Sequence, residues 1–177
     1  MRTLLTSMCI VLTLLLVGSP LKAQSDAQEV YLGLGFGLDY GGFGGKLEYL
    51  PVPKFGLFAG LGYNLLSAGF NFGATYKISP DKKVSPNLMV FYGYNAVFKG
   101  ADDYASQYDA TSYGVTFGGN LDIKVGDKGN KISIGLFIPI RSSKFNDKYD
   151  AAKADPNLEM KNELLPIGFS FGYNFML

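Results

Sequence analysis

Histidine and tryptophan are absent from the 177-residue sequence, and its single cysteine is Cys9. Without histidine, the chain lacks the side chain that most often acts as a general base near neutral pH. Cys9 lies in a leader segment described below, so the rest of the chain has no thiol to form a disulfide. Something other than a covalent cross-link must therefore hold the fold together.

Long apolar runs and an excess of positive charge are missing as well. After residue 23, no segment approaches the roughly 18 consecutive apolar residues of a transmembrane helix, so none is predicted. Lysine and arginine number 16 against 15 aspartate and glutamate residues, and they form no basic stripe. Nucleic acid is therefore not an expected partner.

The first 23 residues have the pattern of a cleavable secretory signal peptide. Arg2 supplies the positive charge, residues 4–17 form a mostly apolar run, and Ala23 offers a small residue before a cut at Gln24. The run is too short to cross a membrane, although an uncleaved signal anchor is the alternative. Because residue 24 is not cysteine, no lipid anchor is expected there.

Removal of 23 of the 177 residues leaves 154, which suits a single domain. We expect residues 24–29 to be a short lead-in and residues 30–177 to form the domain. Within it, large apolar residues alternate with small or polar ones in eight short segments, the pattern of half-buried β-strands. The predicted strands are residues 30–40, 42–49, 55–64, 69–78, 87–98, 112–125, 131–140 and 164–177.

Each segment has one row of large apolar residues and one row of small or polar residues. The apolar row of the last segment is Leu165, Ile167, Phe169, Phe171, Tyr173, Phe175 and Leu177. In the same register, the apolar rows of the first and fifth segments include Leu38, Tyr40, Tyr94 and Ala96. No apolar row contains a charged residue, although 18% of the chain is charged.

An exported chain with eight such segments and no helical span indicates a transmembrane β-barrel, because only helices and closed barrels satisfy every backbone group in lipid. A lysine on the lipid face costs about 2–4 kcal/mol near the midplane, so charges are confined to the other row. That row holds most of the 23 glycines, which suit the narrow interior of eight strands. We therefore predict an all-β fold, a closed antiparallel eight-stranded up-and-down transmembrane barrel that is a monomer. The alternative is a soluble, exported, lipocalin-like barrel with the apolar row inside.

The connections differ at the two ends of the predicted barrel. With both termini on the periplasmic side, the turns at that end are short and consist of residues 50–54, 79–86 and 126–130. At the other end, residues 99–111 and 141–163 are long and polar, as expected of extracellular loops. We expect both loops to be mobile, with at most a helical turn at residues 150–154, because Pro156 limits its length.

From residue 30 to residue 177 the chain resembles the small eight-stranded outer-membrane barrels, the group that includes the OmpA transmembrane domain, OmpX and OmpW. The most specific match is the C-terminus, because the final strand of such proteins ends with alternating apolar residues that the barrel-assembly machinery reads. The matching residues are Phe169, Phe171, Tyr173, Phe175 and Leu177, with leucine where phenylalanine is usual. The leader ending Lys22-Ala23-Gln24 is similar to those of Bacteroidetes-type bacteria. The resemblance implies a cell outer-membrane location, with outer-membrane lipid and the assembly machinery as partners.

Catalysis is not expected of this barrel. The outer-membrane phospholipase, palmitoyl-transferase, deacylase and protease families all use histidine as, or beside, the general base, and this chain has none. We therefore predict no catalytic residues and no cofactor. Asp102, Asp103 and Asp109 lack the ligand spacing and the glycine of a calcium loop, so no metal site is predicted.

Several charged residues project into the predicted lumen. They are Lys46, Glu48, Lys77, Asp122 and Lys124, with Asp39 as a further candidate. One interpretation is a polar path for ions. The favoured one is a charge-paired plug, because eight strands leave no wide channel and unpaired buried charge is costly.

Two functions therefore remain. The first is a structural or surface-interaction role, in which residues 99–111 and 141–163 meet an extracellular partner, with Tyr104 and Tyr108 as contact residues. The second is a narrow conduit or binding barrel for small, apolar molecules, like OmpW. The crowded aromatic rows face lipid rather than lumen, which favours the first.

Overall fold

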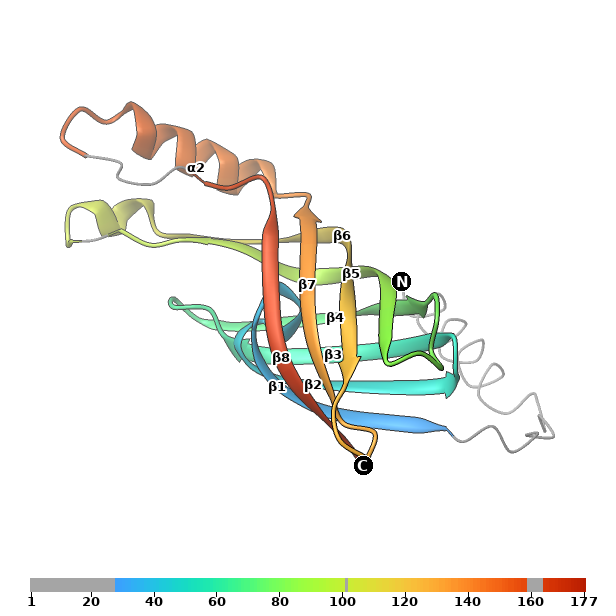
Figure 1. Cartoon of the computed structure of the whole chain (residues 1–177). Coiled ribbons are helices and arrows are strands. Elements are labelled where there is room, and N and C mark those ends of the chain that lie inside the picture. Colours follow the sequence, from blue (N-terminus) through green and yellow to red (C-terminus); the bar gives the residue numbers. More distant parts are fainter. Residues whose placement is uncertain (1–27, 101, 159–163) are drawn as a thin grey trace, which may run out of the picture.

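The computed structural model describes residues 28–100, 102–158 and 164–177 (Figure 1). The strands in these ranges are β1 (Glu29–Gly37), β2 (Gly42–Val52), β3 (Phe55–Tyr63), β4 (Ala68–Lys77), β5 (Val84–Phe98), β6 (Ala110–Lys124), β7 (Lys131–Pro139) and β8 (Gly168–Met176). They are joined by two 3-10 turns, η1 (Leu38–Tyr40) and η2 (Ala105–Tyr108), and by the helix α2 (Ser143–Ala154). The predicted signal peptide, residues 1–23, lies outside the described residues.

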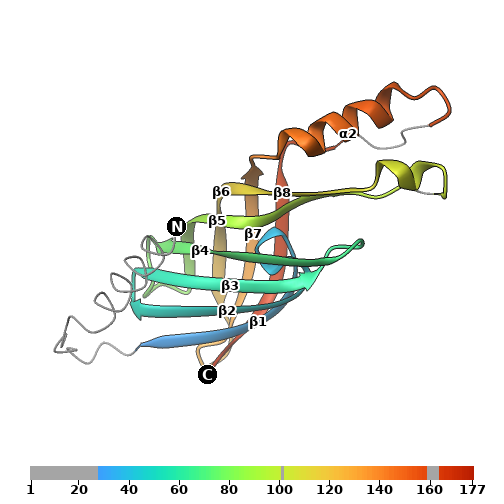
Figure 2. The same ribbon diagram turned by 180° about the vertical axis from the view of Figure 1, so that it is seen from behind.

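The strands form one closed antiparallel barrel in chain order. Each strand pairs with the next, and β1 pairs with β8 from Tyr31–Met176 to Gly37–Ser170 to close the ring. Figures 1 and 2 show this ring from opposite sides. The predicted eight-stranded antiparallel barrel is confirmed.

The large apolar side chains lie on the outside of the ring. Leu34, Leu61 and Leu136 are each at least 60% exposed, whereas Phe58 and Phe137, on the other face, are at most 4% exposed. Within the described residues, no strand carries an exposed charged side chain. The apolar row therefore does not face the lumen, as the lipocalin-like alternative required.

The chain departs from the predicted register at the end of β1. Instead of continuing outward to residue 40, it folds into the lumen as η1, and all three residues of this turn are buried (Figure 2). Gly37, Gly41 and Gly42 make the turn possible with φ angles of 124°, 72° and 109°, which other residues rarely adopt. Leu38 and Tyr40, predicted to face outward, therefore lie inside.

A second departure occurs in β5. Gly93 has a φ angle of 146°, and the pairing with β6 shifts between Tyr94 and Ala96. Such a bulge breaks the alternation of faces. Tyr94 consequently packs with Leu38 and Phe91 in the core, and Ala96 is also buried, so the outward placement predicted for both is wrong.

Inward glycines make room for the inserted turn. Tyr40 lies against β1 and β8, where a Cβ atom at Gly35 or Gly172 would overlap its ring or hydroxyl. A Cβ atom at Gly60 would overlap the main chain of η1 at Asp39. The glycine-rich row therefore accommodates one large inserted side chain, in addition to permitting the tight coiling of a small barrel.

One side of the barrel is much taller than the other. β5 and β6 have 15 residues each, but β4 pairs with β5 only as far as Gly93 and β7 pairs with β6 only from Thr116. The ends of β5 and β6 therefore project beyond the ring as a hairpin, and α2 lies alongside it (Figures 1 and 2). We call residues 94–100, 102–115 and 143–157 the arm.

The helix of the arm is longer than the single turn predicted before Pro156. Phe145 and Ala152 are seven residues apart, about two helical turns, and both are buried. Packing of this face on the hairpin stabilises a polar segment that would be marginal alone. No helix in the described residues is long and apolar enough to cross a membrane.

Candidate functional site

A network of buried ion pairs fills the end of the lumen where β1 begins and β8 ends. At its centre, Lys131 Nζ lies 2.5 Å from Glu48 Oε2 and 2.9 Å from Asp122 Oδ2. Lys77 Nζ lies 3.1 Å from the same oxygen of Asp122. The Lys131 ammonium also lies 3.9 Å from the centre of the Tyr31 ring. All five residues are at most 5% exposed, so these charges meet each other rather than water.

A second ion pair holds the inserted turn. Lys46 of β2 pairs with Asp39 of η1 and both are buried. Its Nζ atom lies 4.5 Å from the centre of the Tyr40 ring and 5.6 Å from that of Phe58, so two aromatic faces supplement the carboxylate. The turn is therefore fixed to the wall by charge as well as by packing.

A chain of hydrogen bonds joins the turn to the ion network. The Tyr40 hydroxyl donates to Asn174 Oδ1 at 3.2 Å, and Asn174 Nδ2 donates to Ser133 Oγ at 2.9 Å. Ser133 Oγ in turn donates to Asp122 Oδ1 at 2.5 Å, and Asn120 Nδ2 donates to the same oxygen at 2.9 Å. Turn and network therefore form one connected polar plug.

The charges of this plug cancel. It contains three lysines and three carboxylates, namely Lys46, Lys77, Lys131, Asp39, Glu48 and Asp122. These residues come from β2, β4, β6, β7 and η1, so the pairs brace the ring across its interior. A balanced set of buried pairs has no net charge with which to attract ions of one sign, and removal of any one member leaves an uncompensated buried charge.

The structure brings together four residues of the predicted lumen cluster, Lys46, Glu48, Lys77 and Asp122. Lys124 lies apart from them: it is half-buried at the end of β6 and forms no ion pair with any described residue. Sequence reasoning missed Lys131, the centre of the network. Its position two residues before Ser133, in the inward row of the same strand, was the signal that could have identified it.

Beyond the plug, an aromatic and aliphatic cluster occupies the lumen, with buried polar residues such as Asn71 and Thr116 beside it. The core cluster there is Leu38, Phe58, Met89, Phe91, Tyr94 and Phe137. The ring of Phe91 meets those of Phe58 and Phe137 edge to face, with centroids 5.7 and 5.2 Å apart. Side chains therefore fill the interior, as expected of eight strands.

A small cavity of about 230 Å³ lies above Leu38, at the end of the lumen opposite the ion network. Its apolar walls include Leu65, Tyr94, Val97, Ile167 and Phe169. Asn64 also borders it. The Asn64 Oδ1 atom accepts backbone hydrogen bonds from Leu66 and Ser67 at 3.2 and 2.9 Å. Its buried Nδ2 group has no hydrogen-bond partner among the described residues.

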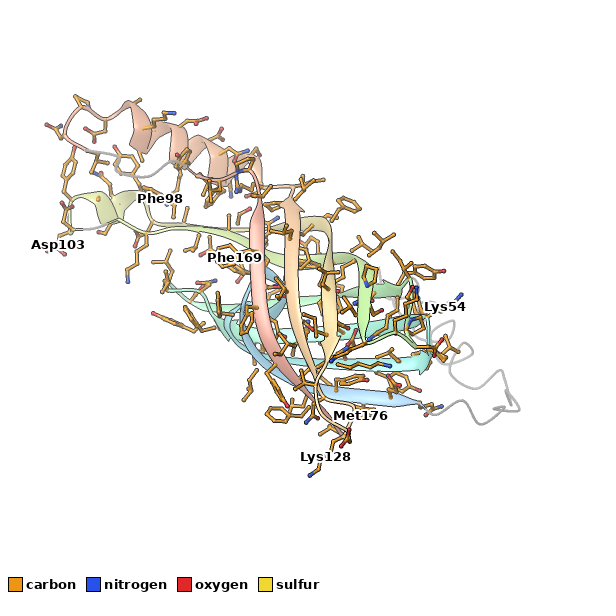
Figure 3. The ribbon with its side chains drawn as sticks, in the orientation of Figure 1. Lys54, Phe98, Asp103, Lys128, Phe169 and Met176 are labelled. Atoms are coloured by element: carbon orange, nitrogen blue, oxygen red, sulfur yellow. The ribbon has the colours of Figure 1, made fainter. Side chains whose placement is uncertain are left out.

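The predicted contact residues Tyr104 and Tyr108 form hydrogen bonds to another residue of the arm. Their hydroxyls donate to Asp155 Oδ2 at 2.8 and 2.9 Å, which ties η2 to the residue that follows α2. Closer to the barrel, the rings of Phe98 and Tyr149 meet edge to face with centroids 5.7 Å apart (Figure 3). Hydrogen bonds and ring packing therefore hold the described parts of the two long connections together, although Tyr104 remains 49% exposed.

These contacts shift the pKa values of two residues of the arm, Asp155 and Tyr108. The backbone N–H of Asn157, followed by the Tyr104 hydroxyl, holds the pKa of Asp155 below its usual value. The hydrogen bond to Asp155 raises the pKa of Tyr108. The arm is therefore arranged around an ionised carboxylate.

Two other aspartates of the arm accept hydrogen bonds from the main chain. Asp102 Oδ1 accepts a hydrogen bond from the Ala105 N–H, and Asp109 Oδ1 accepts one from the Gly100 N–H, both at 2.7 Å. Within the described ranges, no three potential metal-ligating residues gather into a site.

The residues of the predicted assembly signal lie along and just beyond β8. Phe169, Phe171, Phe175 and Leu177 are exposed on the outer face, and Tyr173 is half-buried. Phe36 of β1 contacts two of them across the closing seam, with centroids 5.9 Å from Phe169 and 6.1 Å from Phe171. Recognition of this row by assembly machinery stays a prediction.

Compared with known proteins, the chain matches no family model and no curated protein.

Proposed function

We propose that this chain is an integral outer-membrane β-barrel protein with a plugged lumen, and that it presents its arm at the cell surface as a contact site for an extracellular partner. It would be exported by the signal peptide predicted at residues 1–23 and would resemble the small outer-membrane barrels in location and assembly.

The uncharged outer face of the barrel supports the proposed location in a membrane. Large apolar side chains project from all eight strands, and no strand in the described ranges places an exposed charge among them. In water such a face would cover the barrel with an apolar patch far above the few hundred Å² that soluble monomers usually expose. In a membrane, the same face would contact the hydrocarbon of the lipids, which is as apolar as the side chains themselves.

The plug and the arm support the interaction part. Paired charges and packed rings fill the lumen, so the barrel resembles a scaffold more than a channel. The arm, in contrast, is built from long strands and a helix held by the Asp155 hydrogen bonds. A cross-linked projection binds a partner at lower entropic cost than a flexible loop.

Fractionation tests the membrane part. We expect the processed chain in the outer-membrane fraction, resistant to carbonate extraction, and its refolded form to migrate differently on gels before and after heating. Recovery as a soluble periplasmic protein would refute the proposal.

Site-specific cross-linking tests the interaction part. A photo-reactive residue at Tyr104, which is exposed at the tip of the arm, should give a defined adduct on intact cells. The matched control places it at Leu136, on the outer wall. Deletion of residues 101–110 should leave heat-modifiable folding intact, because long surface loops contribute little to stability. Equal adducts at both positions would refute a specific contact.

The cavity above Leu38 favours a second candidate function, binding of a small apolar molecule at the outer mouth. Its 230 Å³ lie below the 300–1,000 Å³ of pockets for drug-sized ligands, so the ligand would be small. The unpartnered Asn64 Nδ2 would donate to one ligand oxygen. Val97→Glu would place a charge in the cavity and should abolish binding of a neutral naphthalene-type fluorescent probe. Binding that survives this substitution, or is absent from the parent barrel, would exclude the cavity as a site.

A further inference from the structure

A groove of about 510 Å³ crosses the outer wall of the barrel over β3, β4, β5 and β6. Ala74 lies within it, flanked by larger outward residues such as Phe55, Tyr76, Val90 and Phe117. Because β4 presents only a methyl group at this point, the apolar surface is indented where the neighbouring strands carry rings and branched chains. The groove is therefore apolar and open to the outside.

The adjacent end of the barrel carries unpaired positive charge. Lys54, labelled at one end of the barrel in Figure 3, immediately precedes Phe55, which lines the groove. Lys82 and Lys83 lie in the turn between β4 and β5, and the Lys124 N–H donates to the Lys83 carbonyl at 2.8 Å. None of these four lysines forms an ion pair within the described part of the chain.

The charge is confined to the side of the barrel that holds the groove. The turn between β4 and β5 contributes one acid, Asp81, so Lys54, Lys82 and Lys83 together with this aspartate leave a net charge of +2 there. The turn between β6 and β7 contains Asp127 and Lys128, whose charges cancel. Lys124 stands opposite Lys131 in the register of β6 and β7, on the lumen side, and is not part of this charge.

We propose that the groove binds an acyl chain of one anionic phospholipid, whose headgroup lies against these lysines. This inference rests on the membrane location proposed above. A strand rises about 3.3 Å per residue, so Lys83 lies five residues, or about 16 Å, from Leu88 at the groove. That distance matches half of the roughly 30 Å hydrocarbon core, which is the reach of one leaflet. The groove supplies the apolar contact, and the lysines select negative charge.

Native mass spectrometry of the refolded, processed chain tests the proposal, with dioleoyl phosphatidylglycerol and dioleoyl phosphatidylcholine as probes at low salt. Each lysine near an anionic surface contributes about a fivefold gain in binding, so two engaged lysines should favour phosphatidylglycerol by about 25-fold. Lys54→Ala combined with Lys83→Ala should remove that preference. Ala74→Phe should fill the groove and abolish retention of either lipid.

Matched variants separate the site from general adhesion of lipid. Ala59→Phe, at another outward alanine on β3, and Lys128→Ala, on the opposite turn, should retain phosphatidylglycerol as the parent does. Equal retention of both lipids by the parent, or unchanged retention by Ala74→Phe, would overturn the proposal. If either of these results is obtained with a heat-modifiable, membrane-inserted barrel, only the lipid site is refuted. Failure of the barrel to insert into a membrane would refute the proposed function itself.

Discussion

Removal of Lys131 should destabilise the barrel more than removal of any exposed lysine. Lys131 touches Glu48 and Asp122 at 2.5 and 2.9 Å and is 3% exposed. Lys131→Met preserves much of the side-chain volume but leaves three carboxylates facing two lysines. Loss of one partner of a buried ion pair costs about 3–5 kcal/mol. With a urea m-value of about 2 kcal/mol/M, the unfolding midpoint should fall by about 1.5–2.5 M.

Urea titration of the refolded barrel, followed by tyrosine fluorescence and by heat-modifiable mobility, measures this midpoint. Lys128→Met in the nearby exposed turn is the matched control and should change stability by no more than about 0.5 kcal/mol. Adding Glu48→Gln to Lys131→Met restores charge balance, so the double variant should be more stable than Lys131→Met alone. If Lys131→Met behaves like the control, the network is not a brace, and the plug is held by packing alone.

Three further outcomes follow from the structure. Leu136→Lys on the outer wall should cost about 2–4 kcal/mol or block insertion into vesicles, whereas Leu136→Phe should insert normally. Gly172→Ala should lower the urea midpoint by pushing on the Tyr40 hydroxyl, and the smaller Tyr40→Leu should reduce that loss in the double variant. Because Asn157 and other donors lower the pKa of Asp155, its contacts stabilise the arm fully above the unfolded pKa of about 3.9 and are lost as pH falls through the lower folded value. Hydrogen-exchange protection of α2 should therefore drop in acid, and Asp155→Asn should show low protection at neutral pH as well.

The number of strands, their pairing order and the face on which most side chains lie could be predicted, because all three depend on a period of two that repeats along the chain. The alternating row from Leu165 to Leu177, whose residues Phe169 to Phe175 lie in β8, shows this period clearly. The inward position of Glu48 and Asp122 followed from the same alternation, since only the lumen tolerates charge. These properties are local, so one sequence suffices to reveal them.

The inserted turn and the bulge could not be predicted because nothing in the alternation marks them. Leu38 and Tyr40 continue the apolar phase of β1, and only the positive φ angles of Gly37 and Gly41 show that the backbone has left the strand. The partners of Tyr40 lie 134 residues away at Asn174, so the fit is a long-range property. The helix α2 was underestimated for a similar reason, because its stability depends on burial against the hairpin.

The position of η1 has a consequence for the order in which the barrel is made. The turn joins the first two strands, yet its tyrosine is held by the last strand, through Asn174 and the space left by Gly172. Once β8 has paired with β1, the wall of the barrel closes around Tyr40, and the turn could enter only through the outer mouth. We therefore expect the turn to fold inward before or while the seam closes. In a nascent chain with the turn still outside, β8 would meet an unfilled space beside Gly172 and would lack the partner of Asn174. Correct folding of the first hairpin therefore favours pairing of the final strand.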